Sequence, residues 1–140
     1  MNMRLPFLFL SSVFFMVSSV LVAQEEAESD TSSFAQMKFE NSSYNFGDLY
    51  QGEKVEHVFN FVNNGNAPLI LNNVLATCGC TAPEWKKKPL LPGEEGQVKI
   101  VFDSSSKIGR QNKVITIRSN AKSGDYRLRI SAMVLPSKKE

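Results

Sequence analysis

The stretch DYRLRISAMV, residues 125–134, carries the clearest structural pattern in the chain. Apolar side chains occupy every second position from Tyr126 to Val134, and polar side chains such as Arg127 and Arg129 lie between them. Alternation with a period of two is typical of a β-strand that packs one face on a core and exposes the other. The stretch therefore predicts a strand near the C-terminus.

The same period recurs earlier in the chain. In residues 54–63, KVEHVFNFVN, the side chains of Val55, His57, Phe59 and Phe61 share one face. We also expect a short early strand at residues 38–40, with a partner near residues 43–46. Each of these stretches predicts a strand, and so do three others: residues 69–76, 96–102 and 113–119.

Turn signals separate these stretches. Asn64-Gly65, Pro92-Gly93 and Ser123-Gly124-Asp125 are typical of tight turns. After residue 23, no stretch places apolar residues at helical spacing over three turns. The predicted fold class is therefore all-β, an immunoglobulin-like β-sandwich of about seven antiparallel strands.

The N-terminal residues 1–23, MNMRLPFLFLSSVFFMVSSVLVA, predict export. Arg4 precedes an uncharged apolar run that ends near the small residue Ala23, which is the layout of a secretory signal peptide. The run is also just long enough to cross a bilayer, so a retained N-terminal anchor is the alternative. We expect the protein in the periplasm, the cell envelope or outside the cell, with membrane contact only if this segment is retained.

Residues 24–36, QEEAESDTSSFAQ, predict a flexible acidic spacer, because one large apolar residue cannot offset the entropy of ordering. Residues 37–140 then form one sandwich domain. Without residues 1–23 the chain has 16 − 1 = 15 basic residues against 14 acidic ones. This balance argues against a nucleic-acid partner, which needs a concentrated basic surface.

The only two cysteines, Cys78 and Cys80, flank Gly79 at the end of the strand expected at residues 69–76. In an extended chain their Cα atoms would be about 6.6 Å apart, the far limit for a disulfide, although Gly79 allows a bend. Four hypotheses remain: thiols without chemistry, a strained and redox-active local disulfide, a Cu(I) clip, and bridges to another chain.

Other chemistry is scarce. The single histidine, His57, has apolar neighbours on its predicted face, which favours a hydrogen-bonded core residue over a metal ligand. Met37 or Met133 would supply a thioether to a soft metal, but no pattern places either beside Cys78 and Cys80. We therefore expect no cofactor, no resident metal, no catalytic residue and no enzymatic activity.

Trp85 is the candidate for binding by surface contact. It precedes Lys86-Lys87-Lys88, a basic run typical of a solvated loop. We expect loops around residues 77–88 to form one end of the sandwich. Trp85 then either contacts a partner there or folds back over the rim of the core.

Four segments together carry a family resemblance: YNFGDLYQGEKVEH (44–57), FNFVNNGNAPLIL (59–71), TCGCTAPEW (77–85) and LLPGEEGQVKIVFDSSSKIGRQNKVITIRSNA (90–121). The chain resembles the domain-of-unknown-function family 1573, whose members are exported immunoglobulin-like domains. The resemblance implies the fold and the export. It supplies no reaction and no role for Cys78 and Cys80.

Two hypotheses for function follow. The first is an exported, non-enzymatic binding or structural module that contacts a protein or another component of the cell envelope, through a sheet edge or an end loop. The alternative is a thiol-based protein that binds copper or exchanges disulfides through Cys78 and Cys80.

Overall fold

The computed structural model describes residues 32–137. The expected signal segment, residues 1–23, and most of the expected spacer lie outside the described residues. Within residues 32–137 no helix is long and apolar enough to cross a membrane.

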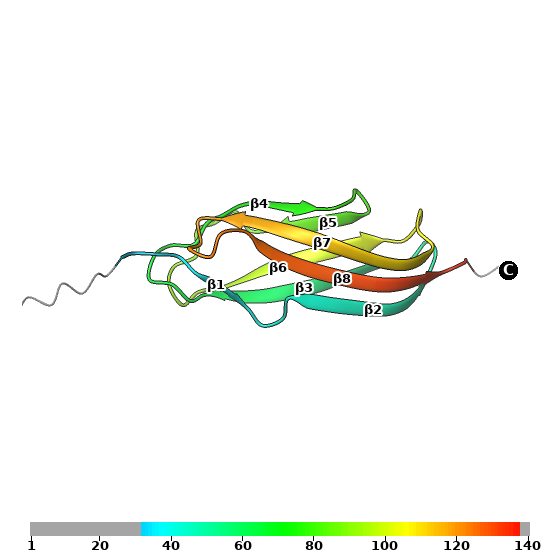
Figure 1. Ribbon diagram of the computed structural model, residues 1–140, viewed down its shortest axis with the longest axis horizontal. Helices are drawn as coiled ribbons and strands as arrows, with labels where there is room; N and C mark the ends of the chain where they lie inside the picture. Colours follow the sequence, from blue (N-terminus) through cyan, green and yellow to red (C-terminus); the bar gives the residue numbers. More distant parts are fainter. Residues whose placement is uncertain (1–31, 138–140) are drawn as a thin grey trace, which may run out of the picture. The chain divides into compact units, whose positions relative to one another are not determined.

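Eight strands form two four-stranded sheets that pack face to face (Figure 1). The sheet that we call the β1 sheet has the order β1 (Met37–Phe39), β3 (Lys54–Asn63), β6 (Glu95–Asp103) and β5 (Thr81–Trp85). The second, the β2 sheet, has the order β2 (Ser43–Tyr50), β8 (Tyr126–Leu135), β7 (Gly109–Ser119) and β4 (Leu71–Ala76).

The core consists of the alternating apolar side chains that the sequence analysis placed on inward faces. Val98 and Ile100 of β6, Ile115 of β7 and Leu128 of β8 are fully buried. Burying a side chain of this size stabilises a fold by about 1.5–3 kcal/mol relative to leaving it in water. The predicted all-β, immunoglobulin-like sandwich is therefore confirmed, with eight strands instead of about seven.

One strand pair differs from the expected antiparallel arrangement. β1 pairs antiparallel with β3, but the chain then crosses to the other sheet, where β2 runs parallel to β8. The expected pairing between residues 38–40 and residues 43–46 is thus wrong. The reason is that β1 completes the edge beside β3 in one sheet, while β2 completes the edge beside β8 in the other.

The strand β5 was expected to be part of a loop. Its sequence TAPEW contains Pro83 and shows little alternation, so the pattern gives no strand signal. Pro83 is tolerated because β5 lies at the edge of its sheet and has only β6 beside it. As a result residues 77–80 and residues 86–94 lie at opposite ends of β5 and do not form one end of the sandwich.

The folded part begins before Met37. Ala35 is 2% exposed and forms an isolated parallel bridge with Ala121, beside the turn from β7 to β8. The backbone of Phe34 accepts hydrogen bonds from the N–H groups of Asn66 and Ala67 at 2.9 and 3.0 Å. The last residues of the expected flexible spacer are therefore part of the domain.

Candidate functional site

Two features singled out by the sequence lie at the two ends of β5. The cysteine turn, residues 77–80, precedes Thr81, and Trp85 ends the strand. Five residues in extended conformation separate these ends by roughly 13 Å, so they form two sites and not one.

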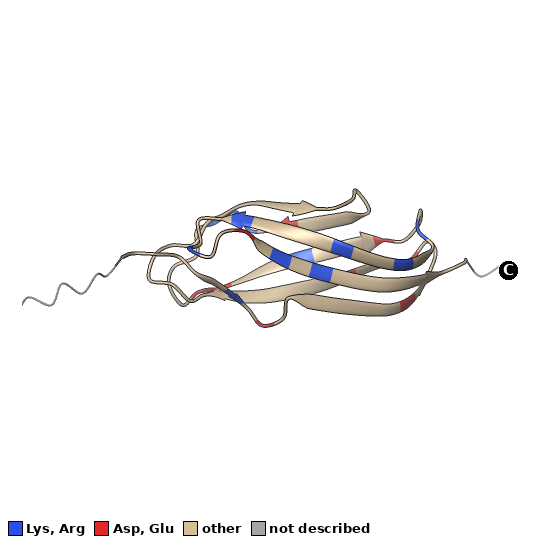
Figure 2. Ribbon diagram, viewed as in Figure 1, with Lys and Arg blue, Asp and Glu red and all other residues tan. Residues whose placement is uncertain are grey.

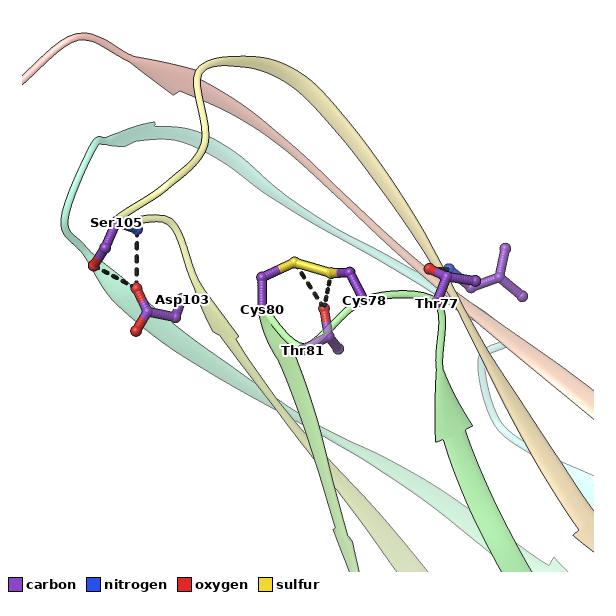
Figure 3. The surroundings of a disulfide bond; sticks show 7 residues. Thr77, Cys78, Cys80, Thr81, Asp103 and Ser105 are labelled. Carbon is purple, nitrogen blue, oxygen red and sulfur yellow. Dashed lines mark hydrogen bonds between the residues drawn. A yellow bond between two sulfur atoms is a disulfide. The ribbon is translucent and has the colours of Figure 1, made fainter.

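The cysteine turn carries the chain from β4 in one sheet to β5 in the other (Figure 3). Cys78 and Cys80 are joined by a disulfide, and their Cα atoms are 5.3 Å apart. This separation is shorter than an extended chain would give, because the segment bends at Gly79, whose Cα faces open space. Both cysteines are half-buried.

The side chain of Thr81 contacts the sulfur atoms of both cysteines. Its side chain is 4% exposed, and its Oγ1 lies 3.7 Å from Sγ of Cys78 and 3.9 Å from Sγ of Cys80 (Figure 3). The N–H of Thr81 also donates to the carbonyl of Cys78 at 3.2 Å. A hydroxyl in this position can donate a hydrogen bond to either sulfur if the pair is reduced.

Asp103 is bonded to this turn through its backbone, and its carboxylate is engaged elsewhere. The N–H of Asp103 donates to the carbonyl of Cys80 at 2.9 Å. The carboxylate of Asp103 accepts from the hydroxyl and the N–H of Ser105, at 2.5 and 2.9 Å. These hydrogen bonds, with a smaller contribution from Lys54, lower the pKa of Asp103 below its ordinary value.

The residues considered as further metal ligands are dispersed. Met37 is buried in β1, and Met133 lies on β8 opposite Arg110 of β7. Among residues 32–137, no group of three or more His, Cys, Asp or Glu side chains comes together.

His57 of β3 lies between aromatic rings from β2 and β3. Its ring stacks on Tyr44 with a centroid distance of 3.6 Å and an interplanar angle of 9°. It also meets the ring of Phe59 edge-on at 4.7 Å. Burial lowers the pKa of His57 below its ordinary value of 6.5, so the structure favours the neutral form. The structure thus places this half-buried side chain between rings, at the edge of the core rather than within it.

A groove of about 790 Å³ lies beside Trp85, at the other end of β5. Its floor consists of Trp85 with Phe61, Leu71 and Leu90, and its rim is charged. Gly96 also lines it, and a side chain there would collide with the ring of Phe61, at 2.9 Å from its Cε atoms. Glycine at this position therefore leaves the space that the ring of Phe61, itself 3% exposed, occupies against β6.

The indole N–H of Trp85 is unpaired. Nε1 is the one buried side-chain nitrogen or oxygen in the described part of the chain that has no hydrogen-bond partner. Leaving a buried donor unsatisfied costs about 1–3 kcal/mol, so each such group in a folded protein calls for an explanation.

The backbone beside the groove is also open. β5 ends at Trp85, which lies opposite Val98 of β6. Residues 95–97 of β6 pair with β3 on one side, and no described strand lies on their other side. The groove therefore combines an apolar floor with a short length of unpaired strand edge.

The side chain of Asn63 joins the segment after β3 to Leu90, which lines the groove. This side chain is 1% exposed, and its Nδ2 donates to the carbonyls of Ala67 and Leu90 at 2.8 and 3.0 Å. Its Oδ1 accepts from the N–H groups of Gly65 and Gln36 at 3.0 and 3.4 Å. The bridge between Leu69 and Leu90 completes the attachment.

Some charged side chains at the rim of the groove form ion pairs, and others do not. Lys99 contacts Glu84 at 3.1 Å and Glu56 at 3.5 Å, and the hydrogen bond to Glu84 is the main reason that the pKa of Lys99 is raised. Lys86 and Lys88 are exposed and have no ion pair within the described residues. The nitrogen of Lys87 lies 5.7 Å from the centre of the Trp85 ring.

The other strand edges are less suited to strand addition. β1 has only three residues, and β5 contains Pro83. β2 and β4 each have a register shift, next to Asn45 and next to Leu71. Short strands, proline and bulges are the devices by which proteins prevent unwanted pairing at edges.

The sequence pointed to Cys78, Cys80 and Trp85 but missed Gly96, Asn63 and Thr81. The alternating pattern of β6 was visible in the sequence. Nothing in that pattern shows that a side chain at Gly96 would collide with the ring of Phe61. Asn63 is the last residue of a clear strand and precedes Asn64-Gly65, so it resembles an ordinary residue at the start of a turn. Its role depends on contacts with residues 27 positions away in both directions.

Similar solved structures agree on the fold. A protein of unknown function from Porphyromonas gingivalis W83 has a TM-score of 0.65 at 18% identity, over 74% of this chain and 48% of that one. The seventh PapD-like domain of human CEP192 has a TM-score of 0.63 at 12% identity, over 75% and 89%. The VesB protease of Vibrio cholerae has a TM-score of 0.58 at 18% identity, over 70% and 32%.

The chain thus spans about half of the Porphyromonas protein and about a third of VesB. At these identities the likeness concerns the fold alone. No curated protein is detectably similar to this chain. The model of the family described as "Protein of unknown function (DUF1573)" matches residues 37–134, most of the chain. The protein therefore belongs to the DUF1573 family.

Proposed function

We propose that this protein is an exported, non-enzymatic binding module that captures an extended segment of a protein partner in the groove beside Trp85. The observation that carries the proposal is the coincidence of the open edge of β6 at residues 95–97 with the unpaired Nε1 of Trp85. Extended peptides bind in this way when main-chain hydrogen bonds supply affinity and pockets for side chains supply specificity.

The groove favours one kind of segment. The half-buried Trp85 offers ring surface to a large apolar side chain. Its indole N–H lacks an acceptor, which a partner carbonyl or side-chain oxygen can provide once a movement of the side chain uncovers the buried Nε1. Lys86 and Lys88 on the rim favour a carboxylate next to that apolar residue. We expect weak affinity, since three residues of edge support only a small interface.

The experiment uses the single tryptophan as a reporter. An array of nine-residue peptides, each with an apolar residue flanked by Asp or Glu, is screened against the full chain. Peptides that bind are then titrated while the emission of Trp85 is recorded. The emission should change, since the only indole in the chain lies in the proposed site.

The variant Lys86→Glu with Lys88→Glu tests the rim. Each exposed ion pair contributes about 0.2–1 kcal/mol, so the affinity for an acidic peptide should fall by roughly twofold to thirtyfold. The control, Lys38→Glu with Lys107→Glu, makes the same change in net charge away from the groove. Peptides that bind without changing the Trp85 emission, or that respond equally to both variants, would contradict the proposal.

A second candidate function rests on the cysteine turn. Because Thr81 Oγ1 reaches both sulfurs, its hydroxyl would stabilise a thiolate at either cysteine. We propose disulfide exchange with a dithiol partner as this alternative. A partner thiolate attacks one sulfur, the other leaves as a thiolate, and the partner's second thiol completes the two-electron reduction and is itself oxidised.

Thr81→Val tests the alternative, because it removes the hydroxyl and keeps the shape. Reduction by dithiothreitol should leave a thiol whose pKa is higher in Thr81→Val than in the unmodified chain. The reduced pair is also the form that would bind Cu(I), and a titration with that ion shows whether it does. Equal thiol pKa values in the two proteins and no copper uptake would remove this candidate.

A further inference from the structure

The outer face of the β2 sheet carries a polar surface that the proposed function does not use. Ile130 and Ala132 of β8 are buried in the core, so the side chain of Ser131 between them faces outward. Ser131 lies opposite Asn45 of β2 on one side and opposite Asn112 of β7 on the other. These three side chains form a row across the sheet, which we call the polar row.

An arginine lies on each side of the polar row. Arg129 precedes Ser131 by two residues on β8, and Arg110 precedes Asn112 by two residues on β7. Because β7 and β8 are antiparallel, the two arginines lie on opposite sides of the row. Figure 2 shows these basic segments along β7 and β8.

This surface is hollowed on both sides of the polar row. Two shallow hollows, of about 440 and 260 Å³, share the three residues of the row in their lining. Arg129 lines the larger hollow, and Arg110 lines the smaller one together with Asp48 of β2. The two hollows therefore form one surface that crosses β2, β8 and β7.

The polar groups of this surface are available to a ligand. Arg110 and Arg129 form no ion pair with any described residue. The side chains of Asn112 and Ser131 form no hydrogen bond within the described part of the chain. The Oδ1 of Asn45 accepts from a backbone N–H two residues further along β2 at 2.9 Å, which leaves its Nδ2 to donate.

The mixture of groups favours one class of ligand. Amides and hydroxyls both donate and accept hydrogen bonds, as the hydroxyls of a sugar do, whereas phosphate oxygens only accept. The carboxylate of Asp48 repels phosphate groups, but it accepts hydrogen bonds from hydroxyls. Tyr44, which is 39% exposed, lines the larger hollow, so part of its ring can pack against the C–H groups of a sugar.

We propose that the outer face of the β2 sheet binds an acidic polysaccharide, a chain of sugars of which some carry carboxylates. Sugar hydroxyls bond to the polar row, and carboxylates on either side of it pair with Arg129 and Arg110, since guanidinium groups bind carboxylates through two parallel N–H donors. Arg110 lies opposite Met133, four residues along β8 from Arg129, so the two arginines are roughly 13 Å apart in that direction. This spacing requires a ligand of several sugar units. The site lies on the other sheet from the groove beside Trp85 and does not depend on the peptide proposed to bind there.

The test titrates hexamers of galacturonic acid and of mannuronic acid into the full chain, kept in a zwitterionic detergent without a sugar headgroup. Amide resonances of residues 45, 112 and 129–131 should shift and saturate at about 20 mM salt. The affinity should fall by about fivefold or more near 0.5 M salt, because exposed charge pairs are screened. The methyl ester of the galacturonic acid hexamer keeps the rings without the charges, and it should bind more weakly by about the same factor.

Two variants separate the charges from the polar row. Arg110→Gln with Arg129→Gln removes both guanidinium groups and should lower the affinity by roughly twofold to thirtyfold. Asn112→Ala removes one exposed amide of the row and should lower it by about twofold to tenfold. The control, Lys86→Gln with Lys88→Gln beside Trp85, makes the same change in net charge as the double arginine variant and should leave the affinity unchanged.

Three results would overturn the proposal. The first is that neither hexamer binds at millimolar concentration. The second is binding that Asn112→Ala leaves unchanged or that the methyl ester matches, since the contact would then need either no polar row or no carboxylate. The third is tighter binding of single-stranded DNA or of phosphatidylglycerol vesicles than of both hexamers, which would make this face a site for phosphate groups.

Discussion

Asn63 illustrates how much of this structure depends on single polar side chains. It is buried at the end of β3, yet its side-chain amide donates two hydrogen bonds through Nδ2 and accepts two through Oδ1. The partners come from the N-terminal segment, from the link to β4 and from the loop before β6. A satisfied buried amide of this kind fixes the relative positions of the segments that it joins.

We predict that Asn63→Ala destabilises the domain by about 2–4 kcal/mol, because it leaves several backbone groups buried without partners. Chemical denaturation followed by circular dichroism would measure the change. Asn112→Ala, at an exposed position on β7, serves as the control and should cost less than about 0.5 kcal/mol. Equal effects of the two substitutions would show that Asn63 has no special role.

His57 makes stability depend on pH. Because its pKa in the folded state is below 6.5, the unfolded chain binds the proton more readily. The free energy of unfolding should therefore decrease as the pH falls through about 6.5 toward the folded-state pKa, and this contribution should be constant below it.

His57→Phe keeps a ring against Tyr44 and removes the titrating group. The loss of stability between about pH 7.5 and pH 5 should be smaller in this variant, as measured by denaturation at each pH. Asp103 also has a lowered pKa, but it titrates below 3.8 and does not interfere in this range. An identical pH dependence in both proteins would contradict this assignment.

At the scale of elements, the sequence predicted most strands, because apolar and polar side chains alternate wherever one face of a strand is buried and the other faces solvent. The bounds expected for residues 54–63 coincide with β3, and those of β6, β7 and β8 differ at one end or both by one to four residues. The sequence did not predict the strand β5, and it paired β1 with β2 wrongly, because neither β5 nor the link between β1 and β2 has an alternating pattern. Their positions depend on which sheet has an unpaired edge, which a single stretch of sequence does not encode.

The candidate site was predictable only in part, for the same reason. Trp85, Cys78 and Cys80 are unusual residue types and attract notice without a structure. Gly65 was noticed for a different reason from the one that the structure gives. It was noticed as part of a tight turn, where glycine is useful because it tolerates a positive φ. The described glycines with a positive φ are others, such as Gly93 and Gly124.

Gly65 is needed because another segment passes close to it. A side chain there would lie 2.6 Å from the backbone nitrogen of Gln36 and collide with the carbonyl oxygen of Phe34. We predict that Gly65→Ala destabilises the domain by about 1–3 kcal/mol in a thermal or chemical denaturation experiment. Gly79→Ala is the control, because its side chain would meet open space without a positive φ, and it should be nearly neutral.

At the scale of the whole molecule, we expect the sandwich to fold without its disulfide. The bond between Cys78 and Cys80 spans one residue, and closing so small a loop contributes only about 1–2 kcal/mol by chain entropy. We predict that Cys78→Ser with Cys80→Ser lowers the free energy of unfolding by no more than about this amount. The same variant should bind peptides in the groove normally. Loss of peptide binding in a folded double variant would connect the cysteine turn to the groove.

The groove beside Trp85 lies at one end of the β1 sheet, where β5 ends and β6 continues. The central claim is that the groove is the place where a partner segment binds, and it depends on the unpaired indole N–H of Trp85 together with the open edge of β6.

The most direct test of this claim is the indole N–H resonance of Trp85 in a ¹⁵N–¹H correlation spectrum. The chain has one tryptophan, so the signal needs no further assignment. On titration with a bound peptide, the account predicts a downfield shift of this proton as it gains an acceptor, with accompanying shifts at residues 95–97. A saturable interaction that leaves the indole signal unmoved and shifts residues of β2, β4, β7 or β8 instead would contradict it.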